Sequence, residues 1–385
     1  MALIANEAYV RQPMVTMIGN KRKLIGGIYS IVKEVWGALG RPVGGLKVMD
    51  GFAGSGVVSR MLASSPEVGE LWTNDLEYFS FLMMECFLKR PGDTEEVRVR
   101  EHVTEMNRLA ASGPYVEGIV SRLYAPRVTA SVAEGERCFY THENALIIDT
   151  LRDYIERQVE VGIRPWLLAP LLIKASIHTN TGGVFKGFYK KDGVGHFGGE
   201  GENALERIMA PIRIEMPQWP ERCVVGEHLA LAHTNQEDVN SLMERIPDAS
   251  LDLIYLDPPY NQHPYGSNYF MLNVIAEGVE PREISGVSGI PRNWNKSRYN
   301  KAREATEAMK DLLAKSLKKA KYVLISYNNE GIIETEAWQK LLEGYQWHLY
   351  ERPYDTYKAS RNLDERAPKV MERLYLVCAP GVALP

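Results

Sequence analysis

The sequence predicts an α/β fold built on a doubly wound, mostly parallel β-sheet. Two strand–turn–helix units follow one another at residues 46–63 and 71–89, and the strand of each unit ends in an acid. Tandem units of this kind are typical of a parallel sheet with helices on both faces. This alternation of strands and helices is absent between residues 91 and 227. We therefore expect one sheet domain, formed by residues 1–90 and 228–385, that is interrupted by an insertion at 91–227.

The strands of the two units are short apolar runs at residues 46–50 and 71–75. A glycine-rich turn separates the first strand from a helical segment at 57–63, and a second helical segment is expected at 78–89. These elements form the first half of the predicted sheet.

Further strands are expected in the last third of the chain. Residues 251–256 and 322–326 are apolar runs that end in polar turns, and both suit buried strands. Residues 346–351 and 372–378 alternate or run apolar and suit an antiparallel hairpin at the sheet edge.

The insertion is expected to be mostly helical. Residues 144–158 and 166–177 carry apolar side chains at helical spacing. A turn-rich stretch at 179–201 follows and holds several glycines and aromatic residues.

Composition excludes several classes of protein. Hydrophobic residues make up 45% and charged residues 24% of the 385 residues, as in ordinary globular proteins. The start of the chain does not resemble a signal peptide, and no apolar run is long enough to span a membrane. The four cysteines are widely spaced, which disfavours a zinc site or a disulfide framework and suits the cytoplasm. We expect no metal and no membrane association.

The net charge of the whole chain gives no sign of a nucleic-acid partner. Lys and Arg number 45, Asp and Glu number 49, and the formal net charge is −4. A nucleic-acid-binding chain is expected to carry a basic excess, so any such binding has to rely on local clusters.

The glycine-rich turn is the first motif with a chemical interpretation. It has the pattern D-x-F-x-G-x-G from Asp50 through Phe52 and Gly54 to Gly56. Glycines after a strand let the backbone approach a ligand, and an acid about 20 residues later, here Asp75, suits ribose hydroxyls. The pattern fits an adenosyl ligand without a pyrophosphate. The alternative is a tight turn that binds nothing.

The second motif, Asp257-Pro258-Pro259-Tyr260, follows the expected strand at 251–256. Neither proline can donate to a strand ladder, but together they form a rigid turn that fixes the direction of a backbone carbonyl. The acid and this carbonyl supply two acceptors for an exocyclic amino group, and the tyrosine offers a face for a planar base. A plain proline turn at a strand end is the alternative.

Residues 52–56, followed far downstream by Asp-Pro-Pro-Tyr, resemble the S-adenosylmethionine-dependent DNA adenine-N6 methyltransferases of the Dam-like group, the D12 class or alpha group. Residues 17–24 resemble the N-terminal motif of this group, in which an apolar or aromatic residue and a lysine approach the cofactor. Met17 and Lys21 occupy these positions. The resemblance implies a Rossmann-like methyltransferase sheet with a mostly helical insertion for target recognition.

Other segments resemble stretches shared by modification methylases of this class. Residues 235–238 resemble the segment whose acid, here Asp238, lies near the cofactor adenine. The remaining similar segments are residues 180–185, 261–269, 326–331 and 354–362. The resemblance therefore touches most of the chain.

The resemblance implies direct methyl transfer to a flipped adenine, because a base inside a duplex cannot be reached. Asp257 and the carbonyl of Pro258 would accept hydrogen bonds from N6, and Tyr260 would stack on the base. No covalent enzyme intermediate is needed, and no Pro-Cys pair is present. The residues expected to contact S-adenosylmethionine are Met17, Lys21, Asp50, Phe52, Gly54, Gly56, Asp75, Asp238 and Asp257.

Two clusters combine basic and aromatic side chains and suit phosphate contacts with double-stranded DNA. One lies in the insertion and the other follows the Asp-Pro-Pro-Tyr motif. The expected DNA-binding residues are Lys186, Lys190, Lys191, Arg292, Lys296 and Arg298. For the second cluster, a solvated helix face is an equally good interpretation.

Three other functions remain open at this stage. An RNA adenine or guanine methyltransferase would usually lack the N-terminal motif and the long insertion. A cytosine-N4 DNA methyltransferase commonly has serine where this chain has Asp257. A regulator without enzymatic activity would have no use for Asp-Pro-Pro-Tyr. We expect a site-specific methyltransferase of adenine N6 in double-stranded DNA, which acts beside an independent restriction endonuclease or alone.

Overall fold

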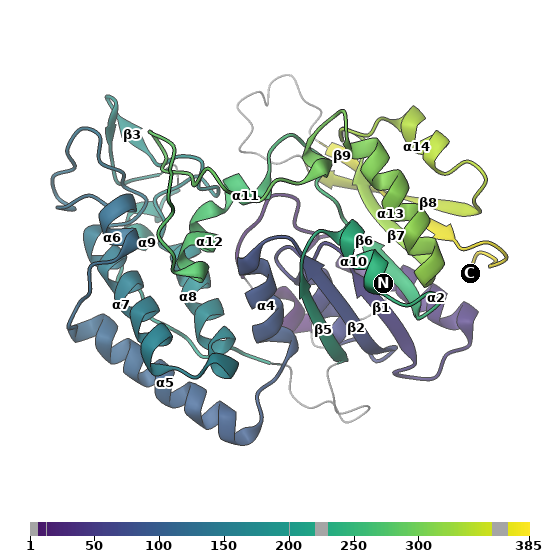
Figure 1. Cartoon of the computed structure of the whole chain (residues 1–385), viewed down its shortest axis with the longest axis horizontal. Coiled ribbons are helices and arrows are strands. Elements are labelled where there is room, and N and C mark those ends of the chain that lie inside the picture. The colour runs from purple at the N-terminus through teal and green to yellow at the C-terminus, as the bar shows by residue number, and fades with distance from the viewer. Residues whose placement is uncertain (1–6, 13, 200, 220–229, 356–368) are drawn as a thin grey trace.

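A mostly parallel β-sheet forms the centre of the larger part of the molecule (Figure 1). The computed structural model describes residues 7–12, 14–199, 201–219, 230–355 and 369–385. Within these residues the sheet has seven strands, in the order β5-β2-β1-β6-β7-β9-β8. They are β1 (Leu46–Asp50), β2 (Val68–Asp75), β5 (Leu231–Gln236), β6 (Leu251–Leu256), β7 (Ala320–Asn328), β8 (Trp347–Asp355) and β9 (Lys369–Cys378).

Strand direction confirms the predicted α/β fold. Strands β5, β2, β1, β6 and β7 run parallel to one another. Strand β9 pairs antiparallel with both β7 and β8, as expected for an edge hairpin. The chain passes from β1 to β2 on one side and places β6 on the other side. The carboxyl ends of β1 and β6 therefore meet at a topological switch point, which is where ligands bind in open sheets of this type.

Helices cover both faces of the sheet, because neighbouring strand residues point to opposite sides. Val48 and Leu253 pack in the core on one face, whereas Met49 and Ile254 pack in the core on the other. The helices of this part are α1 (Glu7–Arg11), α2 (Ile25–Leu39), α3 (Val57–Ala63), α4 (Tyr78–Leu88), α10 (Val239–Arg245), α11 (Tyr265–Asn268), α12 (Phe270–Glu277), the short 3-10 helix η2 (Arg298–Asn300), α13 (Ala305–Lys319) and α14 (Thr335–Leu341).

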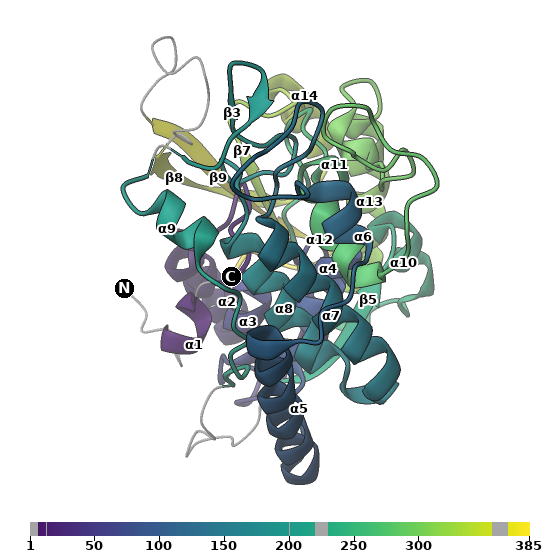
Figure 2. The ribbon, with the colours of Figure 1, turned by 90° about the vertical axis from the view of Figure 1, so that its left-hand side faces the viewer.

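The described residues between 91 and 219 lie to one side of the sheet and hold several helices, while the division into a sheet domain and an insertion stays a prediction (Figures 1 and 2). Helix α4 lies between the sheet and the insertion, and α8 packs against both α4 and α12. Its elements are α5 (Asp93–Ser112), α6 (Ile119–Tyr124), α7 (His142–Gln158), η1 (Val161–Ile163), α8 (Pro165–Ile177), the hairpin of β3 (Lys190–Lys191) and β4 (Val194–Gly195), and α9 (Ala204–Met209). One hydrophobic core therefore continues from the sheet into the insertion.

Strand β5 was not predicted, because its sequence LAHTNQ is polar and none of its residues is fully buried at this sheet edge. The expected domain boundary at residue 227 and most of the segment 354–362 lie outside the described residues. Among the described helices, none is both long and apolar enough to cross a membrane.

Candidate active site

A cavity opens where the carboxyl ends of β1, β2 and β6 meet. Its empty space is about 810 Å3 when the part open to solvent is included. Its walls also include the N-terminal motif and the segment 295–300. The predicted site residues that line it are Met17, Lys21, Asp50, Phe52, Gly54, Asp75, Asp257 and Pro259. The fold thus brings both halves of the predicted site into one cavity.

The glycine-rich turn is fixed by the acid at the end of β2. Asp75 accepts hydrogen bonds from the backbone N–H of Gly54 at 2.7 Å and of Glu77 at 2.9 Å. Gly54 has a positive φ of 54°, a region that favours glycine. Gly56 does not line the cavity, and a Cβ there would lie 2.4 Å from the methyl carbon of Met84. Gly56 therefore allows α3 to pack closely on α4.

Asp50 holds the same turn from the end of β1. Its carboxylate accepts hydrogen bonds from the hydroxyl of Ser59 at 2.6 Å and from the N–H of Phe52 at 3.3 Å. Burial raises the pKa of Asp50 to about 7. This carboxyl lines the cavity while binding the turn to the first residues of α3.

Lys21 and Asp257 form a buried ion pair with a third group that the sequence did not reveal. The Lys21 ammonium lies 2.9 Å from Oδ1 of Asp257 and 3.2 Å from Oε1 of Glu372 on β9. Burial raises the pKa of Asp257 to about 6; Lys21 opposes this shift and Glu372 adds to it. The same two carboxylates outweigh burial and raise the pKa of Lys21 well above its usual value.

Tyr260 is held beside this pair, although it is not among the residues that line the cavity. Its ring centroid lies 5.4 Å from the Lys21 ammonium, and its ring meets Tyr327 edge to face at 6.1 Å. A Cβ on Gly19 would approach the Tyr260 hydroxyl oxygen to 2.7 Å. The N-terminal motif and the Asp-Pro-Pro-Tyr motif are therefore in close contact. Pro258 is buried next to them.

Two tyrosines after the tetrapeptide hold the N-terminal motif in place. The hydroxyl of Tyr265 donates to the carbonyl of Ile18 at 2.7 Å, and the N–H of Ile18 donates to the hydroxyl of Tyr269 at 2.8 Å. Their rings are stacked with centroids 5.8 Å apart. Both tyrosines belong to the segment 261–269. The resemblance of this segment to modification methylases was the sequence feature that could have identified them as site residues.

Glu77 is a second acid in the wall that the sequence did not reveal. Its side chain is buried, and Oε2 accepts hydrogen bonds from the amides of Asn273 at 2.5 Å and Asn295 at 3.1 Å. Burial, with a smaller contribution from Asp75, raises the pKa of Glu77 to about 7. Glu77 therefore adds a second carboxyl group beside Asp75 to the wall of this cavity.

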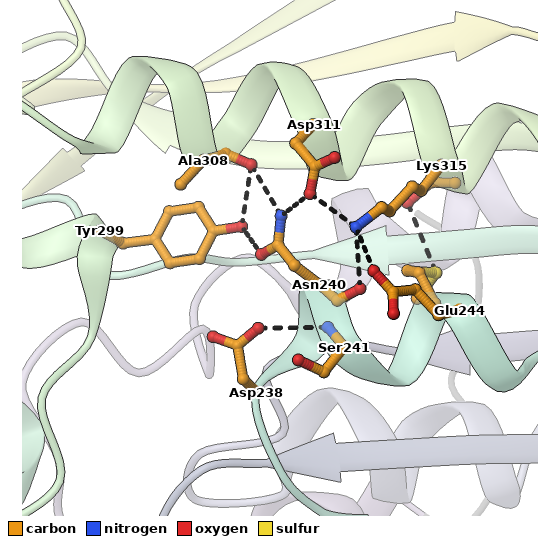
Figure 3. A network of polar contacts seen from close by, with 10 residues as sticks. Asp238, Asn240, Ser241, Glu244, Tyr299, Ala308, Asp311 and Lys315 are labelled. Carbon is orange, nitrogen blue, oxygen red and sulfur yellow. Dashed lines mark hydrogen bonds and ion pairs between the residues drawn. The ribbon is translucent and has the colours of Figure 1, made fainter.

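Asp238 takes a different position from the other predicted acids. It caps α10 by accepting from the N–H of Ser241 at 3.2 Å, and it is not among the cavity-lining residues (Figure 3). Two positions later, Asn240 accepts from the hydroxyl of Tyr299 at 2.7 Å. The Tyr299 ring meets Phe52 at 5.3 Å, edge to face. This segment therefore supports the Phe52 wall of the cavity through Asn240 and Tyr299.

The network around Asn240 extends to α13. Its amide nitrogen donates to the carbonyl of Ala308 at 2.9 Å and to the carboxylate of Asp311 at 2.8 Å (Figure 3). Lys315 pairs with Asp311 at 2.9 Å. These contacts anchor η2, whose last residue Asn300 lines the cavity together with Ser297 just before the helix.

The six predicted DNA-binding residues are exposed and fall into two groups. Lys190 and Lys191 form β3 of a small hairpin, with Lys186 shortly before it. In the second group, Lys296 lies over the ring of Trp294 at 5.6 Å, and η2 begins at Arg298. This stretch is irregular apart from η2, so the interpretation as a solvated helix face is wrong. The second group borders the cavity through Asn295 and Ser297.

No cluster of three or more His, Cys, Asp or Glu side chains suited to a metal ion occurs among the residues that the structure describes.

A parallel sheet with a glycine-rich turn and an acceptor motif in one cavity defines a Rossmann-like methyltransferase. The sequence profile of the D12 class N6 adenine-specific DNA methyltransferases matches residues 17–341. This match covers most of the chain, and the protein belongs to that class. Members of the class use S-adenosylmethionine in general, and the class disfavours the RNA, cytosine-N4 and non-enzymatic alternatives.

Several relatives are named as type II methyltransferases. The type II methyltransferase M.NlaIII of Neisseria lactamica is 26% identical over 372 residues, which cover 94% of this chain and 98% of the relative. M.CviAII of Paramecium bursaria Chlorella virus 1 is 29% identical over 304 residues, which cover 78% of this chain and 80% of the relative. M.FokI of Planomicrobium okeanokoites is 24% identical over 382 residues, 94% of this chain and 52% of the relative.

Proposed function

We propose that this chain methylates adenine N6 within a specific sequence of double-stranded DNA and uses S-adenosylmethionine as the methyl donor. The observation that carries the proposal is the meeting of Asp257 and the glycine-rich turn in one cavity. A methyl acceptor bound at Asp257 and a cofactor bound at the turn would be adjacent, as direct transfer requires.

The residues of the cavity suit this cofactor. The aromatic ring of Phe52 and the apolar Met17 fit an adenine, and the carboxylates of Asp75 and Glu77 fit ribose hydroxyls. Gly266 leaves space in the wall, since a Cβ there would lie 2.6 Å from the Asn295 carbonyl oxygen. When bound, S-adenosylmethionine supplies an electrophilic methyl group.

In this proposal, the chain orients the target amino group. The ionised carboxylate of Asp257 and the carbonyl of Pro258 accept the two N6 hydrogens, which directs the nitrogen lone pair toward the methyl group. They also stabilise the positive charge that develops on nitrogen. Tyr260 stacks on the flipped base, and Pro259 keeps the turn rigid.

A first prediction concerns pH. Because the pKa of Asp257 is raised to about 6, its carboxylate becomes protonated and loses its acceptor role as the pH falls through that value. We expect kcat/KM to fall about tenfold per pH unit below the limb. Steady-state rates from pH 5 to 8.5 measure this, with Asp257→Asn as the control that has no such limb. A flat wild-type profile would contradict the assignment.

A second prediction concerns the wall of the cavity. A Cβ at Gly266 would lie 2.6 Å from the carbonyl oxygen and 3.0 Å from the nitrogen of Asn295. Gly266→Ala should displace this segment and raise the Kd for S-adenosylmethionine about fivefold or more, as overpacking by about 1–3 kcal/mol does. Calorimetry measures this Kd. Gly26→Ala on α2, where a Cβ meets no atom within 4 Å, is the control.

We further propose that residues 91–227 carry target recognition and that the two basic groups contact DNA phosphates. Lys191→Ala should weaken binding equally for cognate and unrelated duplexes and reduce the slope of log K against log salt by about 1. Fluorescence anisotropy at several salt concentrations measures both. The exposed Lys318 on α13 provides the control, Lys318→Ala. An unchanged slope for Lys191→Ala would show that Lys191 does not contact DNA phosphates.

We also propose a role in restriction-modification, with DNA in the cytoplasm as the substrate and an independent endonuclease as companion. The relatives' names as type II methyltransferases support the role in restriction-modification. The test is expression in a host without DNA methylation, followed by single-molecule sequencing. Methylated adenine in one short motif is the expected result. Unmodified DNA with methylated RNA, or N4-methylated cytosine, would refute the proposal.

A further inference from the structure

We propose that Glu372 is a positioning residue that shares the Lys21 ammonium with Asp257, so that Asp257 keeps its strength as a hydrogen-bond acceptor. This inference rests on the proposed function of Asp257. Glu372 lies on β9, in the C-terminal hairpin, and none of the sequence motifs includes it.

Three acceptor oxygens surround the Lys21 ammonium, one in a hydrogen bond and two in ion pairs. An ammonium has three N–H groups. Nζ of Lys21 lies 3.1 Å from the carbonyl oxygen of Gly19, 2.9 Å from Oδ1 of Asp257 and 3.2 Å from Oε1 of Glu372. Lys21 is 3% exposed, so water cannot easily replace one of these acceptors. Glu372 thus supplies the third side of a buried cage.

Glu372 is itself held in place. It is 3% exposed, and its Oε1 accepts a hydrogen bond from the hydroxyl of Ser326 on β7 at 2.7 Å. Ser326 and Leu374 are paired residues of the antiparallel β7–β9 ladder, two positions from Glu372. The hairpin therefore sets the position of the carboxylate, and the carboxylate sets the position of the ammonium.

The charge balance explains why a second carboxylate is useful. With one carboxylate, the ammonium would neutralise Asp257 and weaken it as an acceptor for N6. With two, the ammonium is shared, and the cluster of Lys21, Asp257 and Glu372 keeps one net negative charge when all three are ionised. This charge favours the positive charge that develops on N6 during transfer. The other titratable groups that face the cluster are Asp50, Tyr255, Tyr260 and Tyr265.

The test is Glu372→Gln, which keeps an acceptor oxygen and removes the charge. We expect kcat to fall about tenfold, the size of one charged hydrogen bond, while the Kd values for S-adenosylmethionine and DNA stay within about twofold. The acid limb of kcat/KM should move to lower pH, because Glu372 no longer raises the pKa of Asp257. Glu372→Asp, which keeps the charge, should return the limb toward its wild-type position.

The matched control is Glu351→Gln on the same hairpin. Glu351 pairs with Arg373 at 3.1 Å at the surface, so this variant loses a carboxylate without touching the cage. A purely structural role would lower the melting temperature of Glu372→Gln but leave kcat and the acid limb unchanged, and that result would overturn the inference.

Ser326→Ala is the second test variant, for use if Glu372→Gln does not fold. It keeps both charges but frees the Glu372 carboxylate to rotate, so kcat should fall several-fold at unchanged Kd for S-adenosylmethionine. Wild-type kcat in Ser326→Ala would then overturn the inference. Failure of the proposed function is distinguishable, because it would appear as methylation by Asp257→Ala whatever the Glu372 variants do.

Discussion

Asp257→Ala should abolish methyl transfer while leaving the cofactor site intact. The variant loses the carboxylate that accepts N6, and we expect kcat to fall about a thousandfold or more, as loss of a preorganised charged partner does. The side chain contacts Lys21 but no hydrogen bond of the glycine-rich turn. The Kd for S-adenosylmethionine should therefore change by less than about threefold, or ~0.7 kcal/mol. Transfer of radiolabelled methyl groups and calorimetry measure the two quantities.

The matched control is Asp252→Asn. Asp252 is a buried acid on the same strand, but it pairs with Arg41 at 2.7 Å, away from the cavity. Its loss should reduce stability without a change in kcat at temperatures where the variant is folded. Turnover by Asp257→Ala at the wild-type rate would remove Asp257 from the mechanism and with it the proposed function.

Lys21→Met should have the second large effect, on both stability and activity. The variant leaves the buried carboxylate of Glu372 and the half-buried carboxylate of Asp257 without a cation. Breaking a buried pair in this way costs about 3 to 5 kcal/mol. Chemical denaturation at pH 8 measures the free energy of unfolding. Lys33→Met is the control, since Lys33 is exposed on α2 and should change stability by no more than about 0.5 kcal/mol.

The loss of stability caused by Lys21→Met should be larger at high pH than at low pH. In the wild type, the pKa of Asp257 is raised to about 6, so the folded state binds this proton more tightly than the unfolded state, whose carboxyl titrates near 4. Ionisation of Asp257 therefore costs stability above pH 6, and the cost is relieved as pH falls toward 4. Because Lys21 lowers this pKa, its removal enlarges the cost at high pH. A deficit that grows as pH falls would contradict this account.

The motifs and most sheet elements could be predicted because their signals are local. The strand at 46–50 and the helix at 57–63 were predicted with their observed bounds. The strand at 251–256 is also as predicted, since all six of its residues are buried. In contrast, β5 lies at the sheet edge with no fully buried residue, so no apolar pattern marked it.

Residues that act through long-range contacts could not be predicted from their neighbours in sequence. Glu77 accepts hydrogen bonds from the side-chain amides of Asn273 and Asn295. These two residues lie 196 and 218 positions away in the sequence. Asp238 was expected near the cofactor adenine, and the structure instead links its segment to Phe52 through Asn240 and Tyr299. Whether Asp238 itself contacts the cofactor stays a prediction.

The sequence by itself determined the reaction class. Asp-Pro-Pro-Tyr and the glycine-rich turn are short motifs whose chemistry depends on side chains and backbone within a few residues. The tertiary structure alone decided the electrostatic state of that chemistry. It brings together Lys21, Asp257 and Glu372, which are far apart in the sequence. The Lys21 ammonium lies 2.9 Å from the Asp257 carboxylate and 3.2 Å from the Glu372 carboxylate. Burial strengthens charge interactions, so the acceptor strength of Asp257 depends on residues that only folding brings to it.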